Sequence, residues 1–334
     1  MSTIKLTGWM ELNGQRLPPG AVEMMLKDHP DEILKCGGEF FFAGAGCRGR
    51  DHFGIVQGNC PKGTLICGGE EKGRIDPVVP DLPLEEAITA AVGLRSDEGV
   101  SALSGGVDST LVAYLAHREC VAVGLVDSHD LQRARSTAEA LGLSCSYVII
   151  RPEEVERALP IVIRTIPRRD PVNTGIALTQ YFITRWAGEQ GYKRILTGQG
   201  ADELFGGYGR YLDTKTLEAD LERDFLGLEQ QAERDQAIAA LHGTYLSMPY
   251  LDCRVVRAAR AIPARDKVQG GVRKIPLRKV AERHIPQEFA WYEKKAMQYG
   301  SGVWKALQKL ARKNGYKTSV QDYINQIDRV EHGH

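Results

Sequence analysis

The 334-residue sequence predicts an α/β fold, a doubly wound parallel sheet with a helical C-terminal part, preceded by a small β-rich domain. Between residues 84 and about 200, short apolar runs alternate with helical stretches, as expected where helices cover both faces of a parallel sheet. Two of these runs end in glycine turns, near residues 105 and 198. In such sheets, ligands bind outside the carboxyl ends of the strands, where these turns fall.

Composition and length limit the class of protein. With 43% hydrophobic and 26% charged residues, the chain can bury full cores, and its length suits two domains. The formal net charge is zero, which argues against a nucleic-acid or membrane-surface binder. Because we find no apolar run of about 20 residues and no signal peptide, we expect a soluble, cytoplasmic protein. The sequence leaves the oligomeric state open, a homo-oligomer included.

Residues 1–75 are rich in glycine and in short β-like runs. We expect three strands with glycine turns between them, at residues 39–44, 53–56 and 64–67. The proline-rich stretch 76–83 cannot continue a helix or a central strand. It therefore marks a domain boundary, with a β-rich domain at 1–80 and the main domain at 81–334.

Seven cysteines, an odd number in a long chain, argue against a disulfide framework. Four of them lie in the first part of the chain: Cys36, Cys47, Cys60 and Cys67. Four thiolates can hold zinc or an iron–sulfur cluster, but these cysteines include no Cys-x-x-Cys pair. We favour reduced thiols and keep a metal site as the alternative.

The main domain begins with a helix at residues 84–94, whose apolar side chains share one face. We expect four parallel strands, at residues 100–103, 121–126, 145–150 and 194–197. Helices should lie between them, at residues 110–116, 130–141, 153–165 and 175–190. From residue 214 onward the pattern is helical, and it is strongly charged from 217 to 234.

The turn after the first of these strands has the sequence Ser-Gly-Gly-Val-Asp-Ser at residues 104–109. Backbone amides at such a turn, with the positive end of the next helix, form a pocket for phosphate oxygens. The serines add hydroxyl donors, and Asp108 can hold Mg²⁺. No Gly-Lys-Ser/Thr follows, so this is not a Walker loop. An ordinary glycine turn is the alternative, but the pattern resembles the pyrophosphate-binding loop of the PP-loop ATP pyrophosphatase superfamily.

The loop after the fourth strand carries a second acidic pair, Asp202 and Glu203. Two strand-end loops, each with an aspartate, can hold a magnesium triphosphate from two sides, although such acids are also common as helix N-caps. Together the loops resemble the synthetase domain of glutamine-dependent asparagine synthetase, a relative of the β-lactam synthetases. Further segments that resemble this family in order are residues 94–97, 122–130, 248–252 and 274–278. The resemblance covers about residues 84–310.

The resemblance implies a role for thirteen residues. ATP and the departing pyrophosphate would contact Leu103, Ser104, Gly105, Gly106, Asp108 and Ser109, and the adenosine pocket would contain Val123, Thr197 and Gly198. Asp108 and Asp202 would hold Mg²⁺, and Lys274, Glu203 and Arg278 would be catalytic. In the implied reaction a carboxylate attacks the α-phosphate of ATP, Lys274 neutralises the developing charge, and the acyl-adenylate reacts with ammonia.

The chain departs from the family pattern at two places. Gln199 stands where the family loop commonly has a glutamate near the substrate amino acid, so the acceptor is aspartate or a related acid. Met1-Ser2 stands where glutamine-dependent members have Met-Cys, and residues 38–43 and 50–55 resemble only the latter part of their glutaminase domain. We therefore expect no glutaminase in this chain. Nitrogen would come from free ammonia or from a separate glutaminase or amine-donor subunit.

The sequence thus predicts an ATP-dependent amide ligase that forms AMP and pyrophosphate and acts on a small-molecule carboxylate. Two alternatives remain. One is a PP-loop enzyme that adenylates an RNA base or another substrate for amidation or thiolation, which the neutral charge disfavours. The other is a non-catalytic nucleotide-binding partner, which the retained Asp108, Asp202 and Lys274 disfavour.

Overall fold

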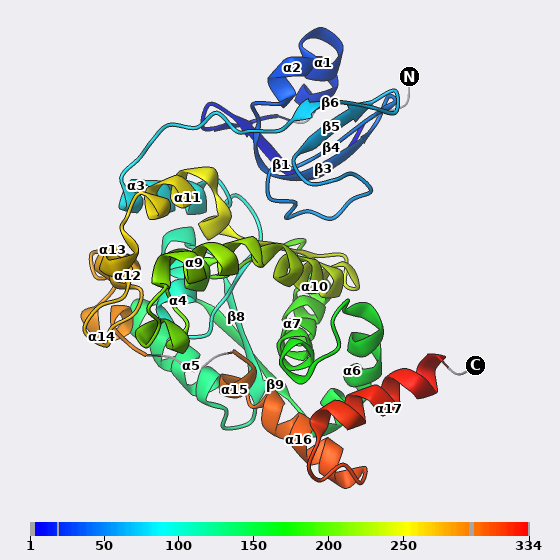
Figure 1. Ribbon diagram of the computed structural model, residues 1–334, viewed down its shortest axis with the longest axis vertical. Helices are drawn as coiled ribbons and strands as arrows, with labels where there is room; N and C mark the ends of the chain where they lie inside the picture. The colour runs from blue at the N-terminus through cyan, green and yellow to red at the C-terminus, as the bar shows by residue number, and fades with distance from the viewer. Residues whose placement is uncertain (1–3, 19, 294–296, 333–334) are drawn as a thin grey trace. The chain divides into compact units, whose positions relative to one another are not determined.

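The computed structural model describes residues 4–18, 20–293 and 297–332 (Figure 1). The chain divides into two compact units. Unit 1 consists of Met1–Asp97, Gln199–Glu229 and Ser247–Pro276, and unit 2 of Glu98–Gly198, Gln230–Leu246 and Leu277–His334. Each unit combines segments that contact one another, and unit 1 contains residues from both sides of position 80. The domain boundary near residue 80 therefore stays a prediction.

Unit 1 begins with a six-stranded sheet in the order β2-β1-β3-β4-β5-β6, with every neighbouring pair antiparallel. Its strands are β1 (Lys5–Leu12), β2 (Gln15–Arg16), β3 (Gly37–Gly44), β4 (Cys47–Arg50), β5 (Thr64–Cys67) and β6 (Glu70–Arg74). Two helices, α1 (Ala21–Asp28) and α2 (Pro30–Ile33), contribute to the core beneath the sheet. That core contains Met10, Val22, Ile33, Phe40, Phe42 and Leu65. The predicted strands at 39–44 and 64–67 are confirmed.

The predicted strand at residues 53–56 is wrong, because this segment wraps around a buried carboxylate. The Asp51 side chain accepts hydrogen bonds from the backbone N–H groups of Ile55 (2.9 Å), Val56 (3.1 Å) and Phe40 (3.2 Å). These amides therefore bond to a side chain and not to a neighbouring strand. The run Phe53–Val56 looked like a strand because it is short and apolar, and Ile55 and Val56 are buried by packing in this loop.

Asp51 should titrate with a raised pKa. Burial raises the pKa of its carboxyl from 3.8 to about 6, and the nearby Glu39 adds to the rise, whereas the amide hydrogen bonds from Ile55 and Val56 oppose it. A raised pKa in the folded state means that Asp51 stabilises the fold fully below pH 3.8 and that this contribution is lost as the pH rises to about 6. A ¹³C-carboxyl NMR titration, assigned with Asp51→Asn, should give a midpoint near 6.

Asp170 provides the internal reference for this titration. Although partial burial opposes it, hydrogen bonds from Asn173 hold the pKa of Asp170 below its usual value. The two aspartates should therefore titrate on opposite sides of 3.8. A midpoint for Asp51 at or below that of Asp170 would contradict the burial argument.

The cysteines of the sheet correct a second expectation. Cys47 on β4 and Cys67 on β5 face each other in the ladder and form a disulfide, whereas reduced thiols were predicted. Cys36 and Cys60 are free and buried. With two of the four sulfurs bonded to each other, these cysteines cannot form a four-thiolate metal site. The odd number of cysteines was misleading, because a disulfide forms where strand pairing brings two cysteines together and the number of cysteines does not show this pairing.

The rest of unit 1 is helical: α3 (Leu84–Gly93), α8 (Ala201–Phe205), η1 (Gly209–Leu212), α9 (Leu217–Leu226), η2 (Pro249–Leu251), α11 (Cys253–Arg260) and α12 (Ala264–Lys267). Within it, α3 packs on α11 and η2. The helix predicted at 84–94 is confirmed, and residues 76–83 contain neither helix nor strand, as their prolines indicate.

Five buried charged side chains join the sheet of unit 1 to η2 and α11. Arg95 pairs with Glu39 (2.7 Å) and Asp252 (3.0 Å), and Arg254 pairs with Asp252 (3.0 Å) and Glu11 (2.6 Å). Each of the five is at most 5% exposed. Because buried charges are tolerated only when paired, this network fixes β1 and β3 against the start of α11.

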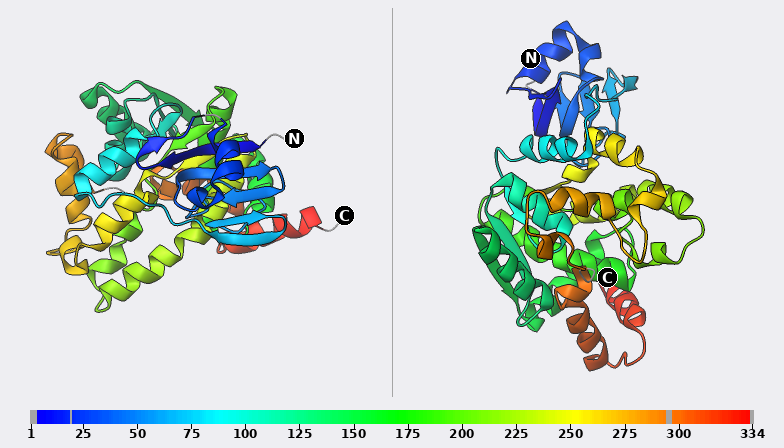
Figure 2. Two further views of the ribbon diagram at one scale, coloured as in Figure 1. Left: turned by 90° about the horizontal axis from the view of Figure 1, so that it is seen from above. Right: turned by 90° about the vertical axis from the view of Figure 1, so that its left-hand side faces the viewer.

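Unit 2 is built on a five-stranded sheet in the order β11-β10-β7-β8-β9. The strands are β7 (Val100–Ala102), β8 (Cys120–Leu125), β9 (Cys145–Ile150), β10 (Arg194–Leu196) and β11 (Tyr245–Ser247), and β10, β7, β8 and β9 pair in parallel. Figure 1 and Figure 2 show α4 (Val107–Ala116) and α5 (His129–Leu141) on one side of the sheet, with α6 (Pro152–Thr165) and α7 (Pro171–Glu189) on the other. The doubly wound parallel fold and its four predicted strands are confirmed.

The remaining helices are α10 (Leu228–Ala240), α13 (Ile275–Ala281), α14 (Gln287–Ala290), α15 (Met297–Gly300), α16 (Val303–Lys313) and α17 (Val320–His332). Most boundaries differ from expectation by one to three residues, and two differences are larger. The strand β11 interrupts the region predicted to be helical throughout. The helix α7 begins at Pro171 and not at 175, because Asp170 caps it by accepting from the N–H groups of Val172 and Asn173.

The strand order places a topological switch point in unit 2. Chain connections lead from β7 to β8 and β9 on one side, and β10 then adds to the other side of β7. The loops that leave the carboxyl ends of β7 and β10 therefore lie at the position where sheets of this kind bind their ligands. These two loops are the ones that carry the glycine turns.

Candidate functional site

The phosphate loop predicted at residues 104–109 joins β7 to α4 and is braced by its own serines. The Oγ of Ser109 accepts from the backbone N–H of Ser104 (3.2 Å), lies 2.8 Å from the Ser104 hydroxyl, and donates to the carbonyl of Gly106 (3.2 Å). Leu103 precedes this turn and is buried, with its N–H bonded to β8 at Val121. The loop is therefore held in one shape by residues of the motif itself.

The start of α4 is suited to an anion. Gly106 is its N-cap residue, and among the described residues no side chain caps this helix end. The first-turn N–H groups can then bind phosphate oxygens, helped by the helix dipole. Gly105 has a φ of +73°, a left-handed conformation that glycine adopts without strain. Gly105 thus has a conformation that explains why the motif has glycine at this position.

The loop after β10 reaches the phosphate loop within unit 2. A Cβ on Gly198 would lie 2.8 Å from the Asp108 Cβ and 2.8 Å from the Ser109 nitrogen, so the two loops touch at this glycine. Thr197 is buried beside it. Val123 lies on β8, which flanks β7 on the side opposite β10. The predicted phosphate and adenosine residues therefore gather at one edge of one sheet.

The second group of predicted residues belongs to unit 1, where Lys274 and Asp202 form an ion pair. The Lys274 Nζ lies 2.6 Å from the Asp202 Oδ1, and Lys274 is only 8% exposed. A Cβ on Gly207 would lie 1.7 Å from this oxygen and 2.2 Å from the Lys274 Cε. Only glycine leaves room for the pair at this position. Gly207 is a functional position that our sequence analysis missed, although it follows the acidic pair closely.

The sequence predicts a helical region around Lys274, but Lys274 itself does not lie in a helix. It directly precedes α13 with a φ of +58°, in the left-handed region that lysine rarely adopts. The neighbouring Arg273 helps to hold this turn by donating to the carbonyl of Gly207 (2.8 Å). Strained backbone of this kind persists where the surroundings enforce it and is frequent at functional sites.

Glu203 and Arg278, the other two predicted catalytic residues, are both buried. In unit 1 the hydroxyl of Tyr208 donates to the Oε1 of Glu203. In unit 2 the Nη1 of Arg278 donates to the carbonyls of Ala290 (2.9 Å) and Tyr292 (3.1 Å). The contacts of Arg278 are those of a residue that positions a backbone segment, and its catalytic role stays a prediction.

The chemistry of the predicted metal ligands fits Mg²⁺. This ion is usually held by one or two carboxylates together with substrate phosphates, and it retains several waters. Asp108 and Asp202 supply two carboxylates, and the described residues contain no group of three or more His, Cys, Asp or Glu that could form an all-protein cage. Asp108 belongs to unit 2 and Asp202 to unit 1, so their binding of one ion stays a prediction.

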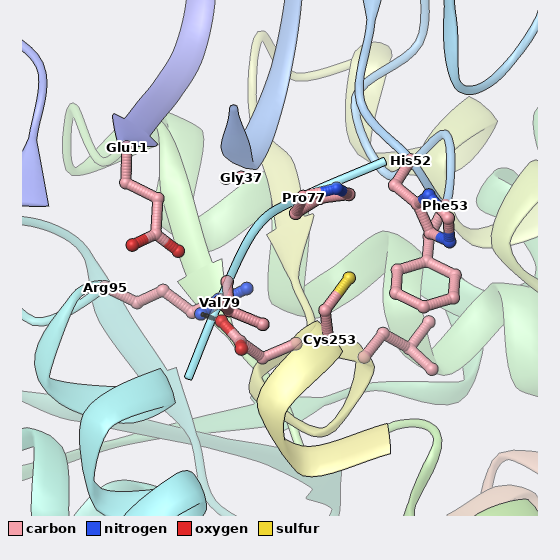
Figure 3. Close-up of a pocket in the computed structure, with 11 residues that line it drawn as sticks. Glu11, Gly37, His52, Phe53, Pro77, Val79, Arg95 and Cys253 are labelled. Atoms are coloured by element: carbon pink, nitrogen blue, oxygen red, sulfur yellow. Dashed lines mark hydrogen bonds and ion pairs between the residues drawn. The ribbon is translucent and has the colours of Figure 1, made fainter. Parts of the chain in front are cut away.

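Unit 1 also contains a small pocket beside its buried charge network (Figure 3). Glu11, Arg95, Asp252 and Cys253 line it together with His52 and Phe53 of the loop that follows Asp51. Burial raises the pKa of the Cys253 thiol to about 12, so this cysteine is not a nucleophile at neutral pH. None of the thirteen predicted site residues is among those that line the pocket.

In the part of the chain that the structure describes, no helix is long and apolar enough to span a membrane.

The architecture and the phosphate loop at the switch point define the class of protein, a nucleotide-binding α/β protein. Residues 83–233 and 224–326 match the family model described as asparagine synthase. The chain belongs to the asparagine synthase family, whose members use ATP. The resemblance seen in the sequence is thereby confirmed.

Individual relatives support this assignment. A candidate glutamine-hydrolysing asparagine synthetase 1 of Methanocaldococcus jannaschii is 33% identical over 270 residues, covering 68% of this chain and 50% of the relative. Glutamine-hydrolysing asparagine synthetase B of Escherichia coli is 30% identical over 227 residues (60% and 40%), and the human glutamine-hydrolysing asparagine synthetase is 28% identical over 246 (68% and 42%). The chain thus spans half or less of the length of these relatives.

Among solved structures, the NMN synthetase of Francisella tularensis is similar at 16% identity, covering 72% of this chain and 98% of that protein. Its TM-score is 0.29, too low to carry an argument about this chain.

Proposed function

We propose that this chain is an ATP-dependent ligase that adenylates a small-molecule carboxylate, aspartate or a related acid, and transfers ammonia to it. The observation that carries this proposal is the contact between the loop of Gly198 and the phosphate loop at the switch point, in a chain of a family that uses ATP. The products would be an amide, AMP and pyrophosphate. Mg²⁺ held by Asp108 and Asp202 would supply charge neutralisation at the phosphates.

In the first step, a carboxylate oxygen of the acceptor attacks the α-phosphorus, and the bond to the pyrophosphate oxygen breaks. The amides of the phosphate loop and of the α4 N-terminus bind the pyrophosphate that leaves. The Lys274 ammonium stabilises the negative charge that develops at the α-phosphate. Its pairing with Asp202 holds this nearly buried amine in a defined place.

In the second step, ammonia attacks the acyl carbon and the bond to AMP breaks. The nitrogen must lose a proton, and Glu203 would accept it at the carboxylate that Tyr208 orients. Gln199 follows Gly198 directly in the chain and offers a neutral amide to the acceptor, which supports an acid related to aspartate as well as aspartate itself.

Free ammonia, or ammonia or an amine supplied by a separate subunit, is the proposed nitrogen source. The sulfur chemistry of the six-stranded sheet supports it. Cys36 is fully buried with a pKa raised by burial to about 12, Cys60 is buried, and Cys47 and Cys67 are joined in a disulfide. Among the described residues of this sheet, no cysteine presents the reactive thiolate that glutamine hydrolysis needs.

The test is pyrophosphate release by the full chain with ATP, Mg²⁺ and ammonium, with and without aspartate and related acids. We expect acid-dependent release, with ammonium more effective than glutamine. Lys274→Ala should lower the rate by about 10²–10³-fold, because it removes a charge that acts in the transition state. Lys274→Arg should restore part of it, and the exposed Lys313→Ala should leave the rate unchanged.

Three results would count against this proposal. Pyrophosphate release that requires RNA and no free acid would indicate adenylation of a base. ATP binding without release under any condition would indicate a non-catalytic nucleotide-binding protein. Glutamine that serves the purified chain as well as ammonium would contradict the proposed nitrogen source.

A further inference from the structure

An arginine to which sequence analysis assigned no role lies against the phosphate loop of unit 2. Arg133 is on α5, and a Cβ on Gly105 would lie 2.5 Å from its Cγ and 3.0 Å from its backbone carbon. The absence of a side chain at Gly105 therefore lets the stem of Arg133 pack directly on the loop. Arg133 is the side chain that adjoins this glycine of the motif.

The guanidinium of Arg133 rests on an aromatic surface formed by Tyr292 and Phe289. Its Cζ lies 3.8 Å from the ring centre of Tyr292 and 4.8 Å from that of Phe289, and its Nη2 donates to the carbonyl of Glu288 (3.2 Å). The Nε of Arg133 is buried without a hydrogen-bond partner. A buried N–H without a hydrogen-bond partner costs free energy, so a ligand that accepts a hydrogen bond from it gains binding free energy.

The aromatic surface is itself fixed by separate contacts. The hydroxyl of Tyr292 lies 2.7 Å from the Nε2 of His129, and the carbonyl of Tyr292 accepts from Arg278 (3.1 Å). Within unit 2, α14, which contains Phe289, also packs against α4. The guanidinium of Arg133 is therefore stacked on aromatic rings that other contacts of unit 2 hold in place.

The charge of Arg133 is not neutralised by a protein carboxylate, unlike that of other buried arginines. Four such arginines each have an acidic partner: Arg95 with Glu39, Arg194 with Glu98, Arg234 with Asp235 and Arg254 with Glu11. Within the described residues, Arg133 forms no ion pair and makes one hydrogen bond, to a backbone carbonyl. A half-buried cation of this kind, placed next to an anion-binding loop, favours an anionic ligand.

We propose that Arg133 is a further anion-binding residue of this site, which binds the β- or γ-phosphate of ATP and the departing pyrophosphate through its remaining N–H groups. This inference rests on the proposed function of the same site. Guanidinium groups suit phosphate because they donate several hydrogen bonds in one plane and keep their charge. Arg133 would thus add a side-chain cation from α5 to the backbone amides of the loop.

The test measures binding to the full-length chain by calorimetry, with magnesium pyrophosphate and AMP as separate probes. Arg133→Met keeps the apolar stem against Gly105 and removes the charge, and it should weaken pyrophosphate binding at least about tenfold, the effect of one charge-assisted hydrogen bond. AMP binding should stay within about twofold. Arg133→Lys should recover part of the pyrophosphate affinity, since it keeps the charge without the planar fork.

Arg135 provides the matched control, because it lies on the same helix, is exposed, and stacks on Tyr147 with its Cζ 4.9 Å from the ring centre. Arg135→Met should change neither affinity. Unchanged pyrophosphate binding in Arg133→Met would overturn the inference. So would an equal loss of pyrophosphate and AMP binding, which would indicate a role in packing alone. If the wild-type chain binds ATP but gives no acid-dependent pyrophosphate release, the proposed function is contradicted. The pyrophosphate affinities of the Arg133 variants would still decide whether Arg133 binds the anion.

Discussion

Gly198→Ala is expected to abolish nucleotide binding, with at least about a hundredfold loss of ATP affinity. The added Cβ would lie 2.8 Å from the Ser109 nitrogen, 2.8 Å from the Asp108 Cβ and 3.0 Å from the Asp108 backbone carbon. Two of these atoms belong to the backbone of the phosphate loop, which cannot move aside without changing the orientation of its N–H groups. Misplacing such donors by about an ångström costs two orders of magnitude or more.

Gly93→Ala is the matched control, because a Cβ at Gly93 meets nothing within 4 Å and alanine favours the α3 helix. It should bind ATP like the wild type. Equilibrium binding of ATP with Mg²⁺ measures both variants, and circular dichroism verifies that each is folded. A folded Gly198→Ala protein with wild-type affinity would show that the two loops do not act together on the nucleotide.

Arg95→Met should lower the free energy of unfolding by about 3–5 kcal/mol, a large loss for a single substitution. Arg95 is 1% exposed and pairs with both Glu39 and Asp252, and it also donates to the carbonyl of Ala91 (2.8 Å). Methionine fills a similar volume, but it leaves two buried carboxylates without this cation. The cost therefore comes mainly from desolvated charge and only secondarily from lost packing.

Urea unfolding, followed by circular dichroism, measures this loss. Arg260 on α11 gives the control, since its pair with Glu222 at the surface is about half exposed and Arg260→Met should cost under about 1 kcal/mol. If Arg95→Met does not fold, adding Glu39→Gln should restore folding, because it removes one of the stranded charges. Equal stability of the Arg95 and Arg260 variants would contradict the importance of the buried network.

Much of the fold could be predicted from local patterns. The four strands that alternate with helices in unit 2 were found because each is a short apolar run bounded by turns, and β9 at Cys145–Ile150 has the predicted bounds. The phosphate loop was found because its glycines, serines and aspartate are contiguous. The predictions were wrong where a contact outside the local pattern determines the structure. The amides of Ile55 and Val56 bond to the Asp51 carboxylate and not to a strand, and Cys47 forms a disulfide with a cysteine 20 residues away.

The amino-acid sequence by itself determined the family, the doubly wound sheet and the position of the glycine turn at residues 104–109, because contiguous motifs and hydrophobic periodicity are local properties. Only the tertiary structure decided that Gly198 touches the loop, that Asp202 pairs with a left-handed Lys274, and that Arg133 adjoins Gly105. Each of these contacts joins residues from different elements, and their spacing in the chain carries no signal of it. The loop at residues 104–109 was therefore predictable, whereas its contacts with Gly198 and Arg133 were not.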